Sequence, residues 1–252
     1  MRKGFDIFGK AYGVMFRNDL HHKDSVDYQI YKKMILINSD SEDYLYHQDI
    51  SKVNIEVTHH ELFSFAKKFR GESDIQTIKN VLGFTSNIVK NYDVPFEKME
   101  FGGTEKEIID RGTDWCTDIS RVGLCLLQCL NIPCRLAILV NGKKAYNGHT
   151  VCEANIENEY TLVDFTYGVL GLLSKKYSVK DLLNKPKIVN KIYRSKLDLN
   201  IDLDYIAGLY DKAAIAEYDI TKKHNFTMSK PNQYYLNMMK FSHDGLWKMG
   251  ED

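Results

Sequence analysis

A helix-length segment followed closely by three strand-length segments constrains the fold of this chain more than any other feature. Apolar residues recur at helical spacing from Cys116 to about Leu130, and Asn131 and Pro133 then end the run. Three segments of strand length follow, at 136–140, 149–156 and 160–165. Because the connections between them are short, these strands should pair antiparallel, and the helix should pack its apolar side on the resulting sheet.

Further helical patterns lie on both sides of this central region. Apolar positions at helical spacing predict helices whose clearest examples are 59–69, 73–92, 179–183 and 203–218. Ser73 and Gln76 form a capping-box pattern at the start of the second of these. Residues 1–58 show no clean period, and we assign them no role. Helices that flank an antiparallel sheet in this way predict an α+β fold.

The charge balance and the cysteine content restrict the class of protein. Lys plus Arg and Asp plus Glu number 34 each, so no net positive field would attract nucleic acid or an anionic membrane surface. We find neither a signal-peptide pattern nor a run of about 20 apolar residues that could span a membrane. Four of the five cysteines crowd between residues 116 and 134, which is a poor disulfide framework and indicates a reducing cytoplasm.

Three residues of the central region have the chemistry of a thiol-dependent active site. Cys116 opens the helix, where unpaired backbone N–H groups and the helix dipole stabilise a thiolate. His149 opens the second strand and could accept the thiol proton. Asp164, on the next strand, has the side-chain parity to lie beside His149 and orient its imidazole. We predict that the three act as nucleophile, base and orienting carboxylate.

A family resemblance is carried by the segments 114–118, 131–135, 148–153 and 160–166. They resemble the core of the transglutaminase-like superfamily of papain-type cysteine enzymes. The resemblance implies a papain-like core in which Cys116, His149 and Asp164 take the family's catalytic roles, with the cysteine helix packed on an antiparallel sheet. We therefore expect a single transglutaminase-like domain over residues 1–252. Its parts would be a core at about 59–168, an N-terminal extension at 1–58 and a C-terminal helical extension at 169–252.

Two side chains are candidate donors to the oxyanion that forms during acyl transfer, in addition to the backbone N–H of Cys116. Trp115 directly precedes the cysteine, but it could equally form an aromatic wall of the cleft. Gln76 carries a side-chain amide, but it also has the competing capping role. The sequence does not decide between these alternatives.

Two acidic residues are candidate substrate contacts. Asp114 stands where the family usually has glycine, and a carboxylate there would raise the pKa of Cys116 by repulsion, point to solvent or bind a substrate amine. Glu153 shares the predicted strand face of His149 and could contact substrate, although a salt bridge to Arg135 is the simpler explanation.

The predicted chemistry is attack of Cys116 on an amide or related acyl carbonyl to form a thioester. Resolution by water would make the chain an amide or peptide bond hydrolase, and resolution by an amine would make it an acyltransferase. A catalytically inactive binding or scaffolding module is the alternative from another class, and Asp114 is the residue that favours it. We expect a peptide, protein or small-molecule amide as substrate, and no nucleic-acid or membrane partner. The cysteines lack paired Cys-x-x-Cys spacing, so we predict neither a metal nor a cofactor.

Overall fold

The computed structural model describes residues 34–47, 60–94, 100, 102–141, 148–196 and 202–220. These residues form a six-stranded sheet with the strand order β1-β6-β2-β3-β4-β5. Its strands are β1 (Ile35–Leu36), β2 (Cys134–Val140), β3 (Gly148–Ile156), β4 (Glu159–Asp164), β5 (Val169–Leu170) and β6 (Lys212–Ala216). Every neighbouring pair is antiparallel. The predicted meander is therefore the β2–β3–β4 part of a larger antiparallel sheet.

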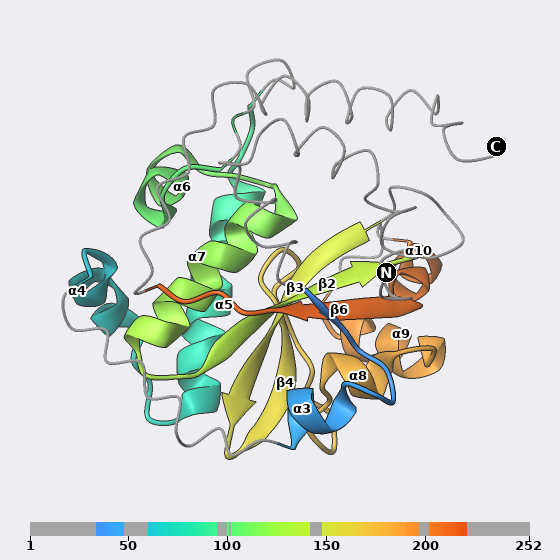
Figure 1. Cartoon of the computed structure of the whole chain (residues 1–252). Helices are drawn as coiled ribbons and strands as arrows, with labels where there is room; N and C mark the ends of the chain where they lie inside the picture. Colours follow the sequence, from blue (N-terminus) through green and yellow to red (C-terminus); the bar gives the residue numbers. More distant parts are fainter. Residues whose placement is uncertain are drawn as a thin grey trace, which may run out of the picture.

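Helices cover both faces of this sheet, which gives an α+β fold (Figure 1). One face carries α4 (Leu62–Ala66), the 3₁₀ helix η2 (Lys67–Phe69), α5 (Asp74–Lys90), α6 (Glu105–Arg111) and α7 (Cys116–Cys129). The other carries α3 (Glu42–Tyr46), α8 (Val179–Leu182), α9 (Pro186–Arg194) and α10 (Leu203–Leu209). Among the helices described, none combines the length and the apolar character that crossing a bilayer requires.

Helix α7 lies at the centre of its layer, where it packs on β2, β3 and α5. Every residue of α7 after Cys116 is buried. The close approach depends on Gly123, because a Cβ atom at this position would lie 2.4 Å from the ring of Phe165. The glycine thus lets the middle of α7 approach Phe165, which directly follows β4.

The alternation along β3 sends its side chains into two separate cores. Cys152, Ala154 and Ile156 pack with α5 and α7 in the first core. Val151 packs with α8, α9 and α10 in the second core. Because side chains alternate along a strand, His149 has the parity of Val151 and lies on the side of the second core, while Thr150 faces α7. This parity decides the surroundings of each residue at the start of β3.

Asparagine supports two of the connections in the way that the sequence predicts. Asn131, directly after α7 and its cap, has φ 60°, the left-handed conformation expected for an asparagine at a helix exit. Glu157 and Asn158 join β3 to β4 with φ 54° and φ 64°, as in a tight two-residue hairpin turn. These residues allow the tight connections that follow α7 and that join β3 to β4 in the central region.

Three sequence predictions about the flanking regions were wrong or incomplete. The helix predicted over 203–218 ends at Leu209, and the following residues form β6 between β1 and β2. The alanine-rich run of β6 favours a helix by propensity, but pairing with two strands and burial on both faces prevail. The C-terminal extension is therefore not purely helical. The segment between the helix predicted over 73–92 and Cys116, where we predicted no helix, holds α6, which begins with a capping box at Thr104 and Glu107.

Candidate active site

The thiol of Cys116 lies at the first position of α7 and is partly exposed. Trp115 is the N-cap residue, and no side chain caps the helix start. The Thr113 hydroxyl instead accepts a hydrogen bond of 3.0 Å from the backbone N–H of Trp115 and fixes the approach to the helix. The free N–H groups of the first turn and the helix dipole therefore remain available to stabilise negative charge at the sulfur.

His149 and Asp164 form a buried pair on the second-core side of the sheet. His149 Nε2 lies 2.8 Å from Asp164 Oδ2, and 6% of His149 and 0% of Asp164 are exposed. The pairing of β3 with β4 ends at Cys152 opposite Val163, and one step further along the same register Val151 would lie opposite Asp164. His149 therefore meets Asp164 as a diagonal neighbour on the same face, a separation that a histidine side chain can bridge.

The pKa values of Cys116 and His149 are both shifted, and each group contributes to the shift of the other. Burial lowers the pKa of His149, but the charge and hydrogen bond of Asp164, together with Cys116, outweigh it and raise this pKa to about 10. Burial raises the pKa of the Cys116 thiol, but the hydrogen bond and charge of His149, with contributions from Thr150, outweigh it and lower this pKa. Both shifts favour a thiolate–imidazolium pair at neutral pH.

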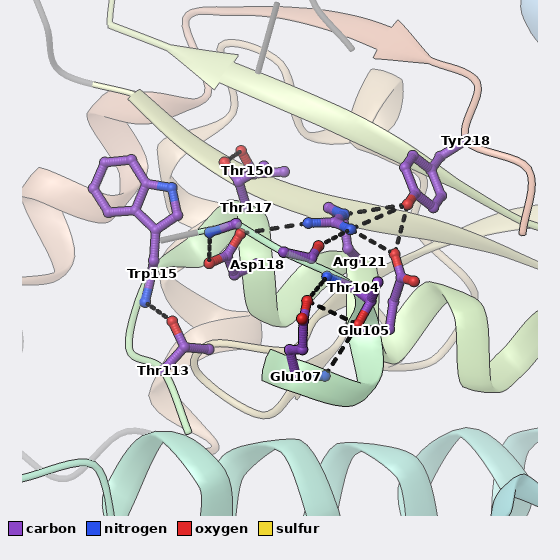
Figure 2. A network of polar contacts seen from close by, with 12 residues as sticks. Thr104, Glu105, Glu107, Thr113, Trp115, Thr117, Asp118, Arg121, Thr150 and Tyr218 are labelled. Atoms are coloured by element: carbon purple, nitrogen blue, oxygen red, sulfur yellow. Dashed lines mark hydrogen bonds and ion pairs between the residues drawn. The ribbon is translucent and has the colours of Figure 1, made fainter. Parts of the chain in front are cut away.

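Thr150 holds the start of β3 against the start of α7. Its hydroxyl lies 3.1 Å from the hydroxyl of Thr117, and its carbonyl accepts a hydrogen bond of 2.9 Å from the Ser120 hydroxyl. Figure 2 shows Thr117 and Thr150 facing each other above the first turn of the helix. These bonds bring Cys116 and His149 together, although they are far apart in sequence. The sequence analysis did not identify Thr150.

A buried cluster of charged residues anchors the first two turns of α7 (Figure 2). Arg121 is 0% exposed and its Nη2 lies 2.7 Å from Glu105 Oε1 of α6, which also accepts a hydrogen bond from the Tyr218 hydroxyl. Asp118 accepts a hydrogen bond of 2.9 Å from Arg111 Nη2. The cluster ties α7 to α6 and to the segment after β6, and so fixes where Cys116 stands.

Trp115 and Asp114, both candidates from the sequence, flank Cys116 on the approach to α7. The Trp115 side chain is partly buried against the first core. Asp114 is exposed, and partial withdrawal from water raises its pKa. The pKa of Cys116 is shifted most by burial and by its contacts with His149 and Thr150. Asp114 therefore does not govern the ionisation of the thiol.

Gln76 does not reach the site, and its prediction as an oxyanion donor was wrong. It is exposed near the start of α5, where its Nε2 donates to Asn80 Oδ1 over 2.9 Å. In the same region Arg70 donates to the carbonyl of Leu130, just beyond the C-terminal end of α7. A helix rises about 1.5 Å per residue, so the length of α7 separates Gln76 from Cys116. The Ser73 hydroxyl accepts from the Gln76 backbone N–H, which confirms Ser73 as the N-cap of α5, whereas the Gln76 side chain contacts Asn80 instead of completing the predicted capping box.

Glu153 is not a substrate contact, and the simpler explanation of this residue is confirmed. Its Oε2 accepts hydrogen bonds of 2.9 and 2.8 Å from Nε and Nη2 of Arg135. Its Oε1 accepts from the Tyr46 hydroxyl and the Val179 backbone N–H. With 0% of its surface exposed, Glu153 has no access to a substrate. The pair instead links α3, the sheet and α8.

The arrangement defines an α+β protein in which a helix-terminal thiol, an imidazole and a carboxylate converge where β3 begins and β4 ends in an antiparallel sheet. A family model described as a transglutaminase-like domain matches residues 60–193, just over half of the chain. The chain therefore belongs to the transglutaminase-like family, whose members are generally thiol-dependent enzymes and include inactive ones. No curated protein and no solved structure gives a significant match. Within the described residues, no group of histidine, cysteine and acidic side chains is arranged to hold a metal ion.

Proposed function

We propose that this chain is a cysteine-dependent amide or peptide bond hydrolase in which Cys116 is the nucleophile, His149 the base and Asp164 the orienting acid. The observation that carries the proposal is the buried 2.8 Å contact between His149 and Asp164 beside a thiol at the N-terminus of α7. This geometry supplies an activated sulfur, a proton carrier and a carboxylate that fixes the imidazole.

The proposed reaction has two halves that share a thioester intermediate. The Cys116 thiolate attacks the acyl carbon, and the backbone N–H at the start of α7, with the Trp115 indole N–H as second donor, stabilises the oxyanion. The protonated His149 then gives its proton to the departing amine as the carbon–nitrogen bond breaks. In the second half, water loses a proton to His149, attacks the thioester and releases the acid and the thiol.

An acyl transfer to an amine would use the same first half, and one observation favours keeping it as the second candidate. Asp114 is an exposed carboxylate two residues before Cys116, where it could bind the ammonium group of an acceptor. Adding a primary amine to a turnover assay should then divert product from the free acid to the amide. A product ratio that does not depend on amine concentration supports hydrolysis.

The proposed chemistry requires a thiol that stays reduced. All five cysteines are free in the structure. Burial raises the pKa of Cys125, Cys129 and Cys152, so these thiols are poor nucleophiles. We infer a cytoplasmic location, in which Cys116 would not be oxidised.

Iodoacetamide near pH 7 should label Cys116 at least about tenfold faster than the other four cysteines. Cys116 is the one whose lowered pKa is joined to partial exposure, whereas the others are buried. Peptide mapping after brief labelling measures the five rates in one sample. Equal labelling of all five cysteines would contradict the proposal and favour an inactive scaffold.

His149→Ala should slow the labelling of Cys116 roughly 100-fold near pH 7 and much less near pH 9. The histidine supplies the hydrogen bond and the charge that lower the pKa of Cys116, and burial of the thiol remains when it is removed. The rate should therefore follow a thiol of higher pKa. His47→Ala is the matched control, because His47 is exposed and contacts Asp43 alone among the described ion pairs. A pH profile that is the same in both variants would show that His149 is not the base.

A further inference from the structure

Asp164 has a second side-chain partner, Tyr193, which the proposed mechanism does not use. Its Oδ2 lies 2.8 Å from His149 Nε2 and accepts a hydrogen bond of 2.7 Å from the hydroxyl of Tyr193 on α9. Its Oδ1 accepts from the backbone N–H groups of Thr166 and Tyr167 at 3.0 and 3.1 Å. Two donors thus share one carboxylate oxygen, while the other oxygen is held by the backbone.

The hydrogen-bonding capacity of each group sets the direction of the hydrogen bonds that link Tyr210, Tyr193 and Asp164. The Tyr193 hydroxyl also lies 2.8 Å from the hydroxyl of Tyr210, just after α10. An ionised carboxylate only accepts, so the single proton of Tyr193 goes to Asp164. Tyr210 must then donate to the oxygen of Tyr193, which makes Tyr193 a stronger donor. The resulting order is Tyr210 to Tyr193 to Asp164, with His149 donating from the opposite side.

We propose that Tyr193 is a positioning residue, which competes with His149 for Oδ2 of Asp164 and, supported by Tyr210, limits how tightly the carboxylate holds the imidazolium. This inference rests on the proposed function, because it concerns how readily His149 exchanges its proton with the sulfur and the leaving group. Burial supports it: Tyr193 is 0% exposed and Tyr210 is 1% exposed, so water does not replace either hydroxyl.

The expected effect on the pKa of His149 arises because His149 and Tyr193 share the negative charge on Oδ2 of Asp164. A hydroxyl dipole with its hydrogen toward Oδ2 takes part of the charge that would otherwise stabilise the imidazolium, and so lowers the pKa of His149. Without it, Asp164 would raise that pKa even above its present value of about 10. The titratable groups around the pair are Cys116 on α7, Cys152 on β3, Tyr167 after β4, Tyr205 on α10, and Tyr193 and Tyr210 themselves.

Tyr193→Phe removes one hydroxyl and keeps the ring. We expect the pKa of His149 to rise by about half to one unit, measured by NMR titration of labelled imidazoles, with the His149→Ala spectrum as assignment. The pH profile of Cys116 alkylation should have a second inflection, at higher pH, where His149 loses its proton. This inflection should move up by the same amount. Tyr210→Phe leaves the Tyr193 hydroxyl in place but weakens it as a donor, so it should give a smaller shift in the same direction.

Tyr177→Phe is the matched control, because Tyr177 also packs against the second core and its hydroxyl has no contact with Asp164. It should leave both readouts unchanged. An unchanged His149 pKa in both the Tyr193 and the Tyr210 variants would overturn the inference while leaving fast Cys116 labelling, and hence the proposed function, intact. If Tyr193→Phe does not fold, the pKa of His149 in Tyr210→Phe decides whether the inference holds. Slow labelling of wild-type Cys116 would defeat the proposed function, and the NMR titration would still decide the role of Tyr193.

Discussion

Arg121→Met should lower the free energy of unfolding near pH 7 by about 3–5 kcal/mol, the cost of removing one partner from a buried ion pair. Methionine keeps the apolar part of the side chain but leaves Glu105 and Asp118 buried without the guanidinium that faces both. The Tyr218 hydroxyl and a backbone hydrogen bond then remain on the Glu105 carboxylate, and neither carries a compensating charge. Urea unfolding followed by circular dichroism measures the loss.

The loss from Arg121→Met should shrink as the pH falls toward about 5. In the wild type, burial would raise the pKa of Glu105, but Arg121 and Tyr218 outweigh it and lower this pKa, so its stabilisation is present at neutral pH and declines in acid. In the variant, burial should raise the pKa of Glu105 above its unfolded value, so the folded state takes up a proton and gains stability in acid. The gain in the variant narrows the difference in unfolding free energy as the pH falls toward about 5, and the loss of stabilisation in the wild type narrows it further below pH 4.5, the ordinary pKa of glutamate.

Lys106→Met is the matched control for Arg121→Met. Lys106 pairs with Asp110 across one turn of α6, and both side chains are exposed to solvent. Surface pairs of this kind contribute little, so the variant should unfold like the wild type at both pH values. If Arg121→Met unfolded like this control, the cluster would not be what anchors α7.

The central region could be predicted from the sequence because local patterns determine it. The helical period placed the start of α7 at Cys116, and the strand lengths placed β2, β3 and β4 within about two residues of their observed ends. The alternation of side chains allowed His149 and Asp164 to share one face, and the register between β3 and β4, which the sequence left open, places them there. These inferences needed no knowledge of the rest of the chain.

The supporting residues of the site could not be predicted, because each depends on contacts between distant segments. Tyr193 is 29 residues from Asp164, and Tyr218 is 97 residues from Arg121. A tyrosine on the apolar side of a short helix is usually a core residue, and an arginine in a helix is usually exposed. The pattern at Thr104 and Glu107 was a signal for α6 that the sequence does contain.

The prediction for Gln76 was wrong for a different reason, which is the relative direction of two packed helices. The sequence shows that α5 and α7 are both amphipathic, but it does not show which ends lie together. Gly112, shortly before α7, lies against Tyr92, just after the end of α5. The two helices are therefore antiparallel, and the start of α5 lies by the far end of α7. If α5 and α7 were parallel, Gln76 would lie beside the Cys116 thiol.

The backbone contacts of Asp164 determine what Asp164→Asn would do. Two N–H groups, of Thr166 and Tyr167, donate to Oδ1, so an asparagine must place its carbonyl oxygen there. Its NH₂ group then occupies the position of Oδ2 and donates to His149 Nε2. The remaining imidazole proton is forced onto Nδ1, the nitrogen left for Cys116, and this tautomer cannot accept the thiol proton.

Asp164→Asn should therefore slow the alkylation of Cys116 near pH 7 roughly 100-fold, the change in thiolate fraction when a thiol pKa rises by about two units. The charge that raises the pKa of His149 most is gone, and burial then keeps the ring neutral and the sulfur protonated. The rate should recover above about pH 9, where the thiol ionises without help. Asp181→Asn, which alters the capping box of α8, should leave the rate unchanged. A wild-type rate in a folded Asp164→Asn variant would show that the carboxylate does not direct the imidazole toward Cys116.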